Sequence, residues 1–253
     1  MSALAISLLV FVAAIGGALG GMLLRAKLPR EHLSDASQSV VQHGIALVAT
    51  MAALVLGLLI ASGNSSYNSA RAQISQLTAQ IILLDRMLAE YGPETMAIRE
   101  GLREAIGPFV TRLWREESSG VEKAGPFVAS SGAEALYGHI RTLAPANDLQ
   151  RSLQERALAT VEQLAQIRLL LFAQSASSLP DPFVGILAFW LVVIFFSFGL
   201  PAPPNLTTFS VLLICALSAS AAIFLILEMS DPFTGLMMIP SGPLRGALPP
   251  LSG

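Results

Sequence analysis

The chain has 253 residues, of which 53% are hydrophobic and only 13% are charged. A typical soluble domain carries about twice that share of charge. The net charge of −2 excludes a basic surface for nucleic acid. The single cysteine, Cys215, excludes a disulfide or a cysteine-based metal site within one chain. These values indicate a membrane protein.

The charges are confined to parts of the chain. None occurs in residues 1–24, 36–70 or 182–227, whereas residues 62–182 carry 11 basic and 13 acidic side chains. We therefore predict a first transmembrane pair (1–62), an extramembrane helical domain (63–180), a second transmembrane pair (181–230), and an interfacial segment with a proline-rich tail (231–253). The predicted fold is an all-α membrane protein, with four transmembrane helices in two pairs and an inserted antiparallel, coiled-coil-like domain.

Four stretches have the ~20 apolar residues that cross a bilayer. They are Ala3–Leu24, Gly44–Ser62, Phe183–Leu200 and Thr207–Leu227. The first lacks a basic amino-terminal region and is too long for a signal peptide, so we expect it to be retained. The prolines of residues 201–205 predict a short turn between the last two spans.

Small residues recur at four-residue spacing in the spans, which lets helix backbones approach closely. The first span has two overlapping Gly-x-x-x-Gly pairs, Gly16/Gly20 and Gly17/Gly21, and the second has a small-residue stripe. Ordinary alanine-rich composition is the alternative. We predict helix or oligomer packing at Gly16, Gly20, Ala49 and Ala61, and a pore lining on the second span at Thr50, Ala53 and Gly57.

An apolar seam follows the second span. From Tyr67 to Tyr91 it advances in steps of three and four residues, which is the heptad pattern of packed helices. No proline lies between Pro29 and Pro93, so we expect the second span to continue as one helix to about Tyr91, a rod of roughly 70 Å. The seam positions predicted to pack are Ile74, Leu77, Ile81, Leu84 and Leu88.

Beside the seam runs a polar stripe without charge. A solvated helix face normally mixes acidic and basic residues, and this one contains only serine and glutamine. We interpret it as the lining of a bundle interior or of a water-filled vestibule that continues a pore. A water-facing strip that happens to lack charge is the alternative. The stripe comprises Ser62, Ser66, Ser69, Gln73, Gln76 and Gln80.

The rest of the middle domain is predicted to be helical. After Pro93 we expect a helix of about 20 residues, a loop over Ser118–Gly132 and a short helix to Leu143. Asn147 or Asp148 can cap a final helix that runs to about Ser178. Similar lengths predict that this helix pairs antiparallel with the one ending near Tyr91.

The pattern D-P-F-x-G-[IL] occurs at residues 181–186 and again at 231–236. Aspartate followed by proline is a strong helix start. The first copy is expected to begin the third span, and the second an interfacial or re-entrant segment. Two independent caps built from favoured residues are the alternative to a shared role.

No nucleophile–base or metal constellation is present, so we predict neither an enzyme nor a cofactor or metal site. The three histidines, His32, His43 and His139, show no ligand spacing. The spans contain no ionisable residue, which disfavours a proton-driven transporter. Glu228, at the end of the fourth span, is expected to reach water. The function classes that remain are a pore and a membrane assembly or signalling component.

Several blocks together carry a family resemblance across nearly the whole chain. They are Leu28-Pro29 with His32-Leu33, residues 49–59 (ATMAALVLGLL), Leu84-Asp85-Arg86, Tyr91-Gly92-Pro93-Glu94, Phe198-Gly199-Leu200, Ala202-Pro203-Pro204-Asn205, Leu225-Ile226-Leu227-Glu228, Pro232-Phe233 and Gly235-Leu236. With these blocks the chain resembles the bacterial bestrophin-like family of four-span membrane proteins.

Bestrophins are pentameric anion channels with two pairs of spans around a helical domain. The resemblance therefore implies a homo-oligomer, a pentamer by analogy, that sits in the lipid bilayer and passes inorganic ions. The chain has no acidic cluster like the bestrophin calcium clasp and no Asn-Asn-Phe-Asp-like motif, so the resemblance does not extend to calcium gating or anion selectivity. The predicted function is a homo-oligomeric ion channel whose pore is lined by the second span. A non-conducting scaffold or signalling protein that binds partners through its long helices is the alternative.

The predicted location is the bacterial inner membrane. The loop after the first span holds Arg25, Lys27 and Arg30, and the positive-inside rule places such a loop in the cytoplasm. The middle domain would then be extracytoplasmic. A bestrophin-like topology would place it in the cytoplasm instead.

Overall fold

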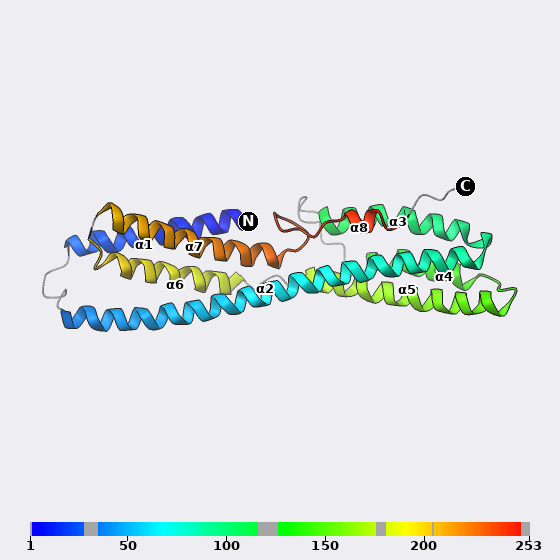
Figure 1. Ribbon diagram of the computed structural model, residues 1–253, viewed down its shortest axis with the longest axis horizontal. Helices are drawn as coiled ribbons and strands as arrows, with labels where there is room; N and C mark the ends of the chain where they lie inside the picture. The colour runs from blue at the N-terminus through cyan, green and yellow to red at the C-terminus, as the bar shows by residue number, and fades with distance from the viewer. Residues whose placement is uncertain (1, 28–34, 116–125, 176–180, 204, 249–253) are drawn as a thin grey trace. The chain divides into compact units, whose positions relative to one another are not determined.

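The computed structural model describes residues 2–27, 35–115, 126–175, 181–203 and 205–248. These residues form helices and no strands, which confirms the all-α prediction (Figure 1). The elements are α1 (Ala3–Lys27), α2 (Asp35–Tyr91), the 3-10 helix η2 (Pro93–Thr95), α3 (Met96–Arg115), α4 (Pro126–Arg141), α5 (Asp148–Ser175), α6 (Asp181–Gly199), α7 (Leu206–Ser230) and α8 (Gly242–Arg245).

Four of these helices, α1, α2, α6 and α7, contain stretches long and apolar enough to cross a membrane. The first, third and fourth stretches match the predicted spans in position, and the second, Gln42–Tyr91, contains the predicted span Gly44–Ser62 and continues beyond it. Helix α2 continues without interruption through Gly63 to Tyr91, as the absence of proline predicts. The predicted continuous helix, residues 44–91, makes up most of α2, which has 57 residues and begins earlier, at Asp35.

The chain folds as two compact units. The first contains residues 1–66 and 179–230, and the second contains residues 67–178 and 231–253. Helix α2 therefore contributes its first part to one unit and its last part to the other. The residues after α7, predicted as a separate interfacial segment and tail, join the second unit.

In the first unit α1 packs against both α6 and α7 (Figure 1). Polar contacts tie these helices together at both ends of α1. The Ser220 hydroxyl donates to the Ser7 carbonyl at 2.7 Å, and the Arg25 guanidinium donates to the Pro201 carbonyl at 2.9 Å. The buried residues of this core are Val10, Ala14, Ala18, Leu187, Leu191, Phe195, Leu212, Ala216 and Ile223.

Helices α1 and α6 approach closely at the second of the two glycine pairs. A Cβ on Gly21 would lie 2.0 Å from the Phe196 carbonyl oxygen, and one on Gly17 would lie 2.8 Å from the Val192 carbonyl oxygen. By contrast, Gly16 is exposed with nothing within 4 Å of its Cβ position. Gly20 makes only an ordinary contact with a phenylalanine ring. Within the chain, Gly17 and Gly21 thus make the tight contact, and any role of Gly16 would involve another molecule.

The second unit is built around the last part of α2. All of the seam from Ala70 to Tyr91 is buried, in one core with residues of α3, α4 and α5. Helix α5 runs back antiparallel to α2 (Figure 1), and its first turn is held to the end of α2 because Gln150 Nε2 donates to the Tyr91 carbonyl at 2.9 Å. Of the two predicted caps of α5, Asn147 is the one used, since its Oδ1 accepts from the Gln150 backbone N–H at 2.8 Å.

One boundary differs from the prediction. Helix α4 begins at Pro126, so the later part of the predicted loop over Ser118–Gly132 is helical. Proline is well tolerated in the first turn of a helix, where its missing N–H would be unpaired anyway. The earlier part of that loop and residues 176–180, at the predicted end of α5, lie outside the described residues.

The second D-P-F-x-G copy forms a turn, whereas the first copy begins α6. Residues 231–236 close on themselves through the Thr234 N–H to the Asp231 carbonyl, and Gly235 has a φ of +79°. This φ favours glycine. Phe233 then enters the core of the second unit, where its ring meets Trp114 edge-on at 5.3 Å. The two copies therefore have different structural roles.

Candidate functional site

The membrane-spanning part of α2 is the least buried span. Among residues 44–62, Ala52 alone is buried within the chain. Large apolar side chains stand out from one side of it, with exposed fractions of 50–70%, at Leu47, Met51, Leu54 and Leu58. A span exposed to this degree is available to lipid, to a pore or to another subunit.

The residues predicted to line a pore on this span face away from the chain's own helices. Thr50, Ala53 and Gly57 are all exposed, and nothing lies within 4 Å of a Cβ built on Gly57. Gly57 lies five residues after the buried Ala52, which places it about 140° around the helix. The Thr50 hydroxyl donates to the Ala46 carbonyl at 2.8 Å, so its hydrogen-bonding need is met inside the helix.

The small residues predicted to pack are only partly covered. Ala49 is half-buried and Ala61 is exposed. Ala61, nine residues after Ala52, lies on the opposite side of α2, whereas Ala49, three residues before Ala52, lies on the same side as Ala52. The chain itself therefore does not use this small-residue stripe as a tight contact.

The serine and glutamine stripe is not a helical continuation of the Thr50, Ala53 and Gly57 face. Ser62 follows Gly57 by five residues, so it lies about 140° away around the helix. Along the stripe Ser62, Ser66 and Gln76 are exposed, whereas Ser69, Gln73 and Gln80 are half-buried beside the seam. Among the described residues, the buried carboxamide oxygens of Gln73 and Gln80 have no hydrogen-bond partner.

The seam residues predicted to pack are buried inside this chain. Leu77, Leu84 and Leu88 are at most 1% exposed, and Ile74 and Ile81 are at most 7% exposed. Their partners are helices of the same unit. The seam is therefore occupied by the chain's own helices.

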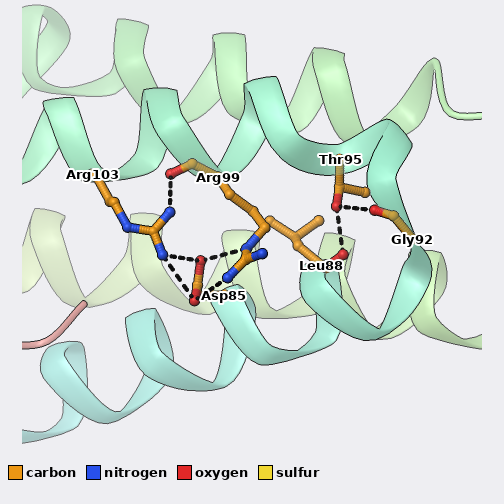
Figure 2. Close-up of polar contacts among 6 residues, drawn as sticks. All are labelled: Asp85, Leu88, Gly92, Thr95, Arg99 and Arg103. Atoms are coloured by element: carbon orange, nitrogen blue, oxygen red, sulfur yellow. Dashed lines mark hydrogen bonds and ion pairs between the residues drawn. The ribbon is translucent and has the colours of Figure 1, made fainter. Parts of the chain in front are cut away.

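A charge cluster joins α2 to α3 beside the seam (Figure 2). Arg99 forms a bidentate ion pair with the Asp85 carboxylate: its Nε donates to Oδ1 at 2.9 Å and its Nη2 donates to Oδ2 at 3.1 Å. Arg103 lies one turn further along α3, and its Nη2 reaches the same carboxylate at 3.3 and 3.4 Å. The hydrogen bond to Asp85 raises the pKa of the Arg99 guanidinium, which keeps this group charged. Such a bidentate pair fixes geometry as well as charge.

The turn that leads into this cluster is fixed by Thr95, which is fully buried. Its hydroxyl lies against the carbonyl oxygens of Leu88 and Gly92, the latter at 2.8 Å (Figure 2). Gly92 has a φ of +138°, a conformation that favours glycine. The site prediction did not include these residues, although the spacing of Arg99 and Arg103, four residues apart on one helix face, was a usable signal.

Glu228 lies at the end of the fourth span, as expected, but is less exposed than expected. It is only 7% exposed, so other parts of the chain largely cover the side chain that was expected to reach water. Within the described residues no group of three or more histidine, cysteine, aspartate or glutamate side chains is placed to hold a metal ion. His43 and His139 are exposed, and His32 lies outside the described residues.

Solved structures share this fold. A bacterial bestrophin homologue from Klebsiella pneumoniae, solved as a variant, superposes with a TM-score of 0.62 at 15% identity, covering 94% of each chain. A second variant of a Klebsiella pneumoniae bestrophin homologue gives 0.60 at 16% identity with the same coverage. A structure described as a membrane protein gives 0.61 at 15% identity, again covering 94% of each chain. At these identities the likeness concerns the fold alone.

The sequence itself matches the family description of the bestrophin-like domain over residues 12–244, which is nearly the whole chain. A search among curated proteins finds no matching relative. The family match and the fold agree with the resemblance carried by the sequence blocks. The chain is a member of the bestrophin-like domain family.

Proposed function

We propose that the protein is a homo-oligomeric ion channel, with a pore lined in the membrane by α2. The observation that carries this proposal is the uneven burial of the spans. Helices α1, α6 and α7 pack on one another, whereas the membrane part of α2 buries only Ala52. A helix with small and hydroxyl side chains on its outer face suits the axis of a ring of subunits, where large side chains would close the path.

The proposed lining in the membrane is the face that bears Thr50, Ala53 and Gly57. This face is exposed and turns away from the chain's own bundle. The leucines of the neighbouring sector, such as Leu54 and Leu58, would then contact lipid or the next subunit. By analogy with bestrophins the ring would have five subunits.

The serine and glutamine stripe would line a wider vestibule outside the membrane. A wide path can be lined by more than one side of each helix, so the stripe need not share the Gly57 face. Of the stripe glutamines, Gln76 is the exposed one, and its replacement by arginine should alter conductance without disturbing the core.

The alternative, a scaffold that binds partners through its apolar seam, is less well supported. Leu77 and Leu84 are 1% and 0% exposed because the chain's own helices cover them. A partner would have to displace those helices. Replacing these leucines by polar residues should therefore destabilise the chain rather than remove a binding surface.

The proposal is tested by cysteine modification during flux. Cys215 is exposed and is the only native cysteine, so it is first replaced by serine. Single cysteines are then placed at Thr50, Ala53 and Gly57, with Leu54 and Leu58 as matched positions on the neighbouring sector. Purified protein in liposomes should pass ions, and a charged thiol reagent should block the flux only at the first three positions.

Two results would contradict the proposal. Block at Leu54 and Leu58 alone would assign the pore to the leucine sector. A monomeric particle by light scattering, without flux in liposomes, would exclude an oligomeric channel. The oligomer's mass is measured on the detergent-solubilised protein from which the vesicles are made, so stoichiometry and conduction are read from one preparation.

The proposed location is the bacterial inner membrane, with the second unit on the extracytoplasmic side. A cysteine at Ser75, which is exposed on α2 in that unit, should react with a membrane-impermeant maleimide on intact spheroplasts. Reaction only after lysis would place the unit in the cytoplasm.

A further inference from the structure

The turn after α7 carries an unusual set of exposed apolar side chains. Leu236 is 79% exposed, Met238 is 54% exposed and Met237 is 37% exposed. These three consecutive residues form the tip of the turn. Contiguous apolar side chains held out from a fold mark an interaction surface rather than ordinary solvent exposure.

The buried residues on either side of the tip, its shoulders Phe233 and Ile239, hold it in an exposed position. On one side Phe233 is buried at 7% exposure, and on the other Ile239 is buried at 2%. The Ile239 N–H donates to the Pro232 carbonyl at 2.8 Å and closes the turn. Trp114 contacts both shoulders, with its ring on Phe233 and its indole N–H on the Ile239 carbonyl. The fold thus fixes the base of the turn and leaves its tip outside.

The chain also limits how far the tip lies from the membrane. Helix α7 ends at Ser230, and its exposed apolar surface extends at least to Leu225. Leu236 follows Ser230 by six residues, which span at most about 20 Å when fully extended. Leu236 therefore lies within about 20 Å of the end of α7.

The composition of the turn suits lipid. No charged residue occurs from Pro232 to Leu244, and the next charge is the exposed Arg245. Methionine is flexible and adapts to irregular apolar surroundings. An uncharged apolar tip followed by a basic residue is the arrangement expected at the boundary between acyl chains and headgroups.

We propose that Leu236, Met237 and Met238 form a membrane-anchoring tip that inserts into the bilayer interface beside the end of α7. The occupant of this surface is the lipid of the membrane that α7 crosses. Because Phe233 and Ile239 are part of the second unit's core, the tip ties that unit to the membrane surface. This anchoring does not depend on whether the protein conducts ions.

The test uses the full chain, with Cys215 replaced by serine and one new cysteine for an environment-sensitive fluorophore. The probe position is Met238→Cys, and the matched control is Glu104→Cys, which is exposed on α3 in the same unit. Both proteins are reconstituted in phosphatidylcholine–phosphatidylglycerol vesicles, with and without nitroxide-labelled lipid. The label is itself apolar, so the control also measures its own tendency to enter lipid.

The label at residue 238 should lose fluorescence to nitroxide lipid and be shielded from aqueous iodide, whereas the label at residue 104 should show the reverse. Quenching at 238 by iodide but not by nitroxide lipid would overturn the proposal, because the tip would then lie in water. Shielding from both quenchers would also overturn it, since a second copy of the chain would then cover the tip. A single symmetric peak in size-exclusion chromatography shows for each variant that the fold is intact.

Discussion

Trp114 donates its indole N–H to the carbonyl oxygen of Ile239 at 2.7 Å, although α6 and α7 separate these residues in the chain. Trp114 precedes the two helices and Ile239 follows them, yet both belong to the second unit. A chain that leaves a domain and returns to it crosses the bilayer an even number of times. This contact therefore supports the proposal that α6 and α7 cross as a pair.

Removing that hydrogen bond should loosen the carboxy-terminal segment without unfolding the unit. Trp114→Phe keeps a ring against Phe233 but leaves the Ile239 carbonyl unpaired, which should cost about 1 kcal/mol. Hydrogen exchange of residues 232–247 should become faster. Trp190→Phe, on α6 in the first unit, is the control and should leave this exchange unchanged. Equal acceleration in both variants would argue against a specific role of the Trp114 contact.

The seam on α2 should be the main source of packing energy in the second unit. Leu84 is 0% exposed, so Leu84→Ala should destabilise the unit by about 3 kcal/mol through lost burial and a remaining cavity. The neighbouring Leu83 is 48% exposed, and Leu83→Ala is the matched control with a much smaller effect. Thermal unfolding of the detergent-solubilised protein measures both. A similar loss from both variants would mean that the seam is not the core.

The seam could be predicted because a three–four spacing of apolar residues is a direct consequence of helix geometry. The spans and the continuity of α2 followed from equally local properties, namely apolar length and the absence of proline. Contacts between distant segments could not be predicted in this way. The choice of Gly17 and Gly21 over Gly16 depends on where α6 lies, and periodicity on α1 alone is equally consistent with either pair.

The two D-P-F-x-G copies show the same limit. Their local sequence favours a helix start in both, but only the first is followed by an uninterrupted apolar run that supports α6. In the second copy, Phe233 instead packs in the core of the second unit against Trp114. Pro240 follows soon after the turn, so no long apolar helix can begin there. The expected exposure of Glu228 was also wrong, because burial at a helix end depends on neighbours from other helices.

The Asp85 cluster should be essential to the α2–α3 junction. The Asp85 side chain is 9% exposed and faces two arginines whose side chains are 18% and 16% exposed. Asp85→Asn removes the charge that compensates them, which should destabilise the second unit by about 3 kcal/mol. Asp148→Asn is the control, because Asp148 pairs with Arg151 on the surface and such pairs contribute little. Thermal unfolding at matched pH distinguishes the two, and equal effects would contradict a special role for Asp85.

The contact between α1 and α6 should tolerate no side chain at Gly21. An added Cβ would lie 2.0 Å from the Phe196 carbonyl oxygen, which is backbone and cannot rotate away. Gly21→Leu should therefore push the two helices apart. Overpacking a core typically costs about 1–3 kcal/mol, and the first unit should be destabilised by at least that much. Gly16→Leu is the matched control, because nothing lies within 4 Å of a Cβ there. Thermal unfolding in detergent should separate the two variants clearly.

If Gly16→Leu preserves stability but lowers the mass of the particle, Gly16 contacts another subunit, as the sequence pattern predicted. If the Gly21 variant is as stable as the native protein, the helices are not in close contact.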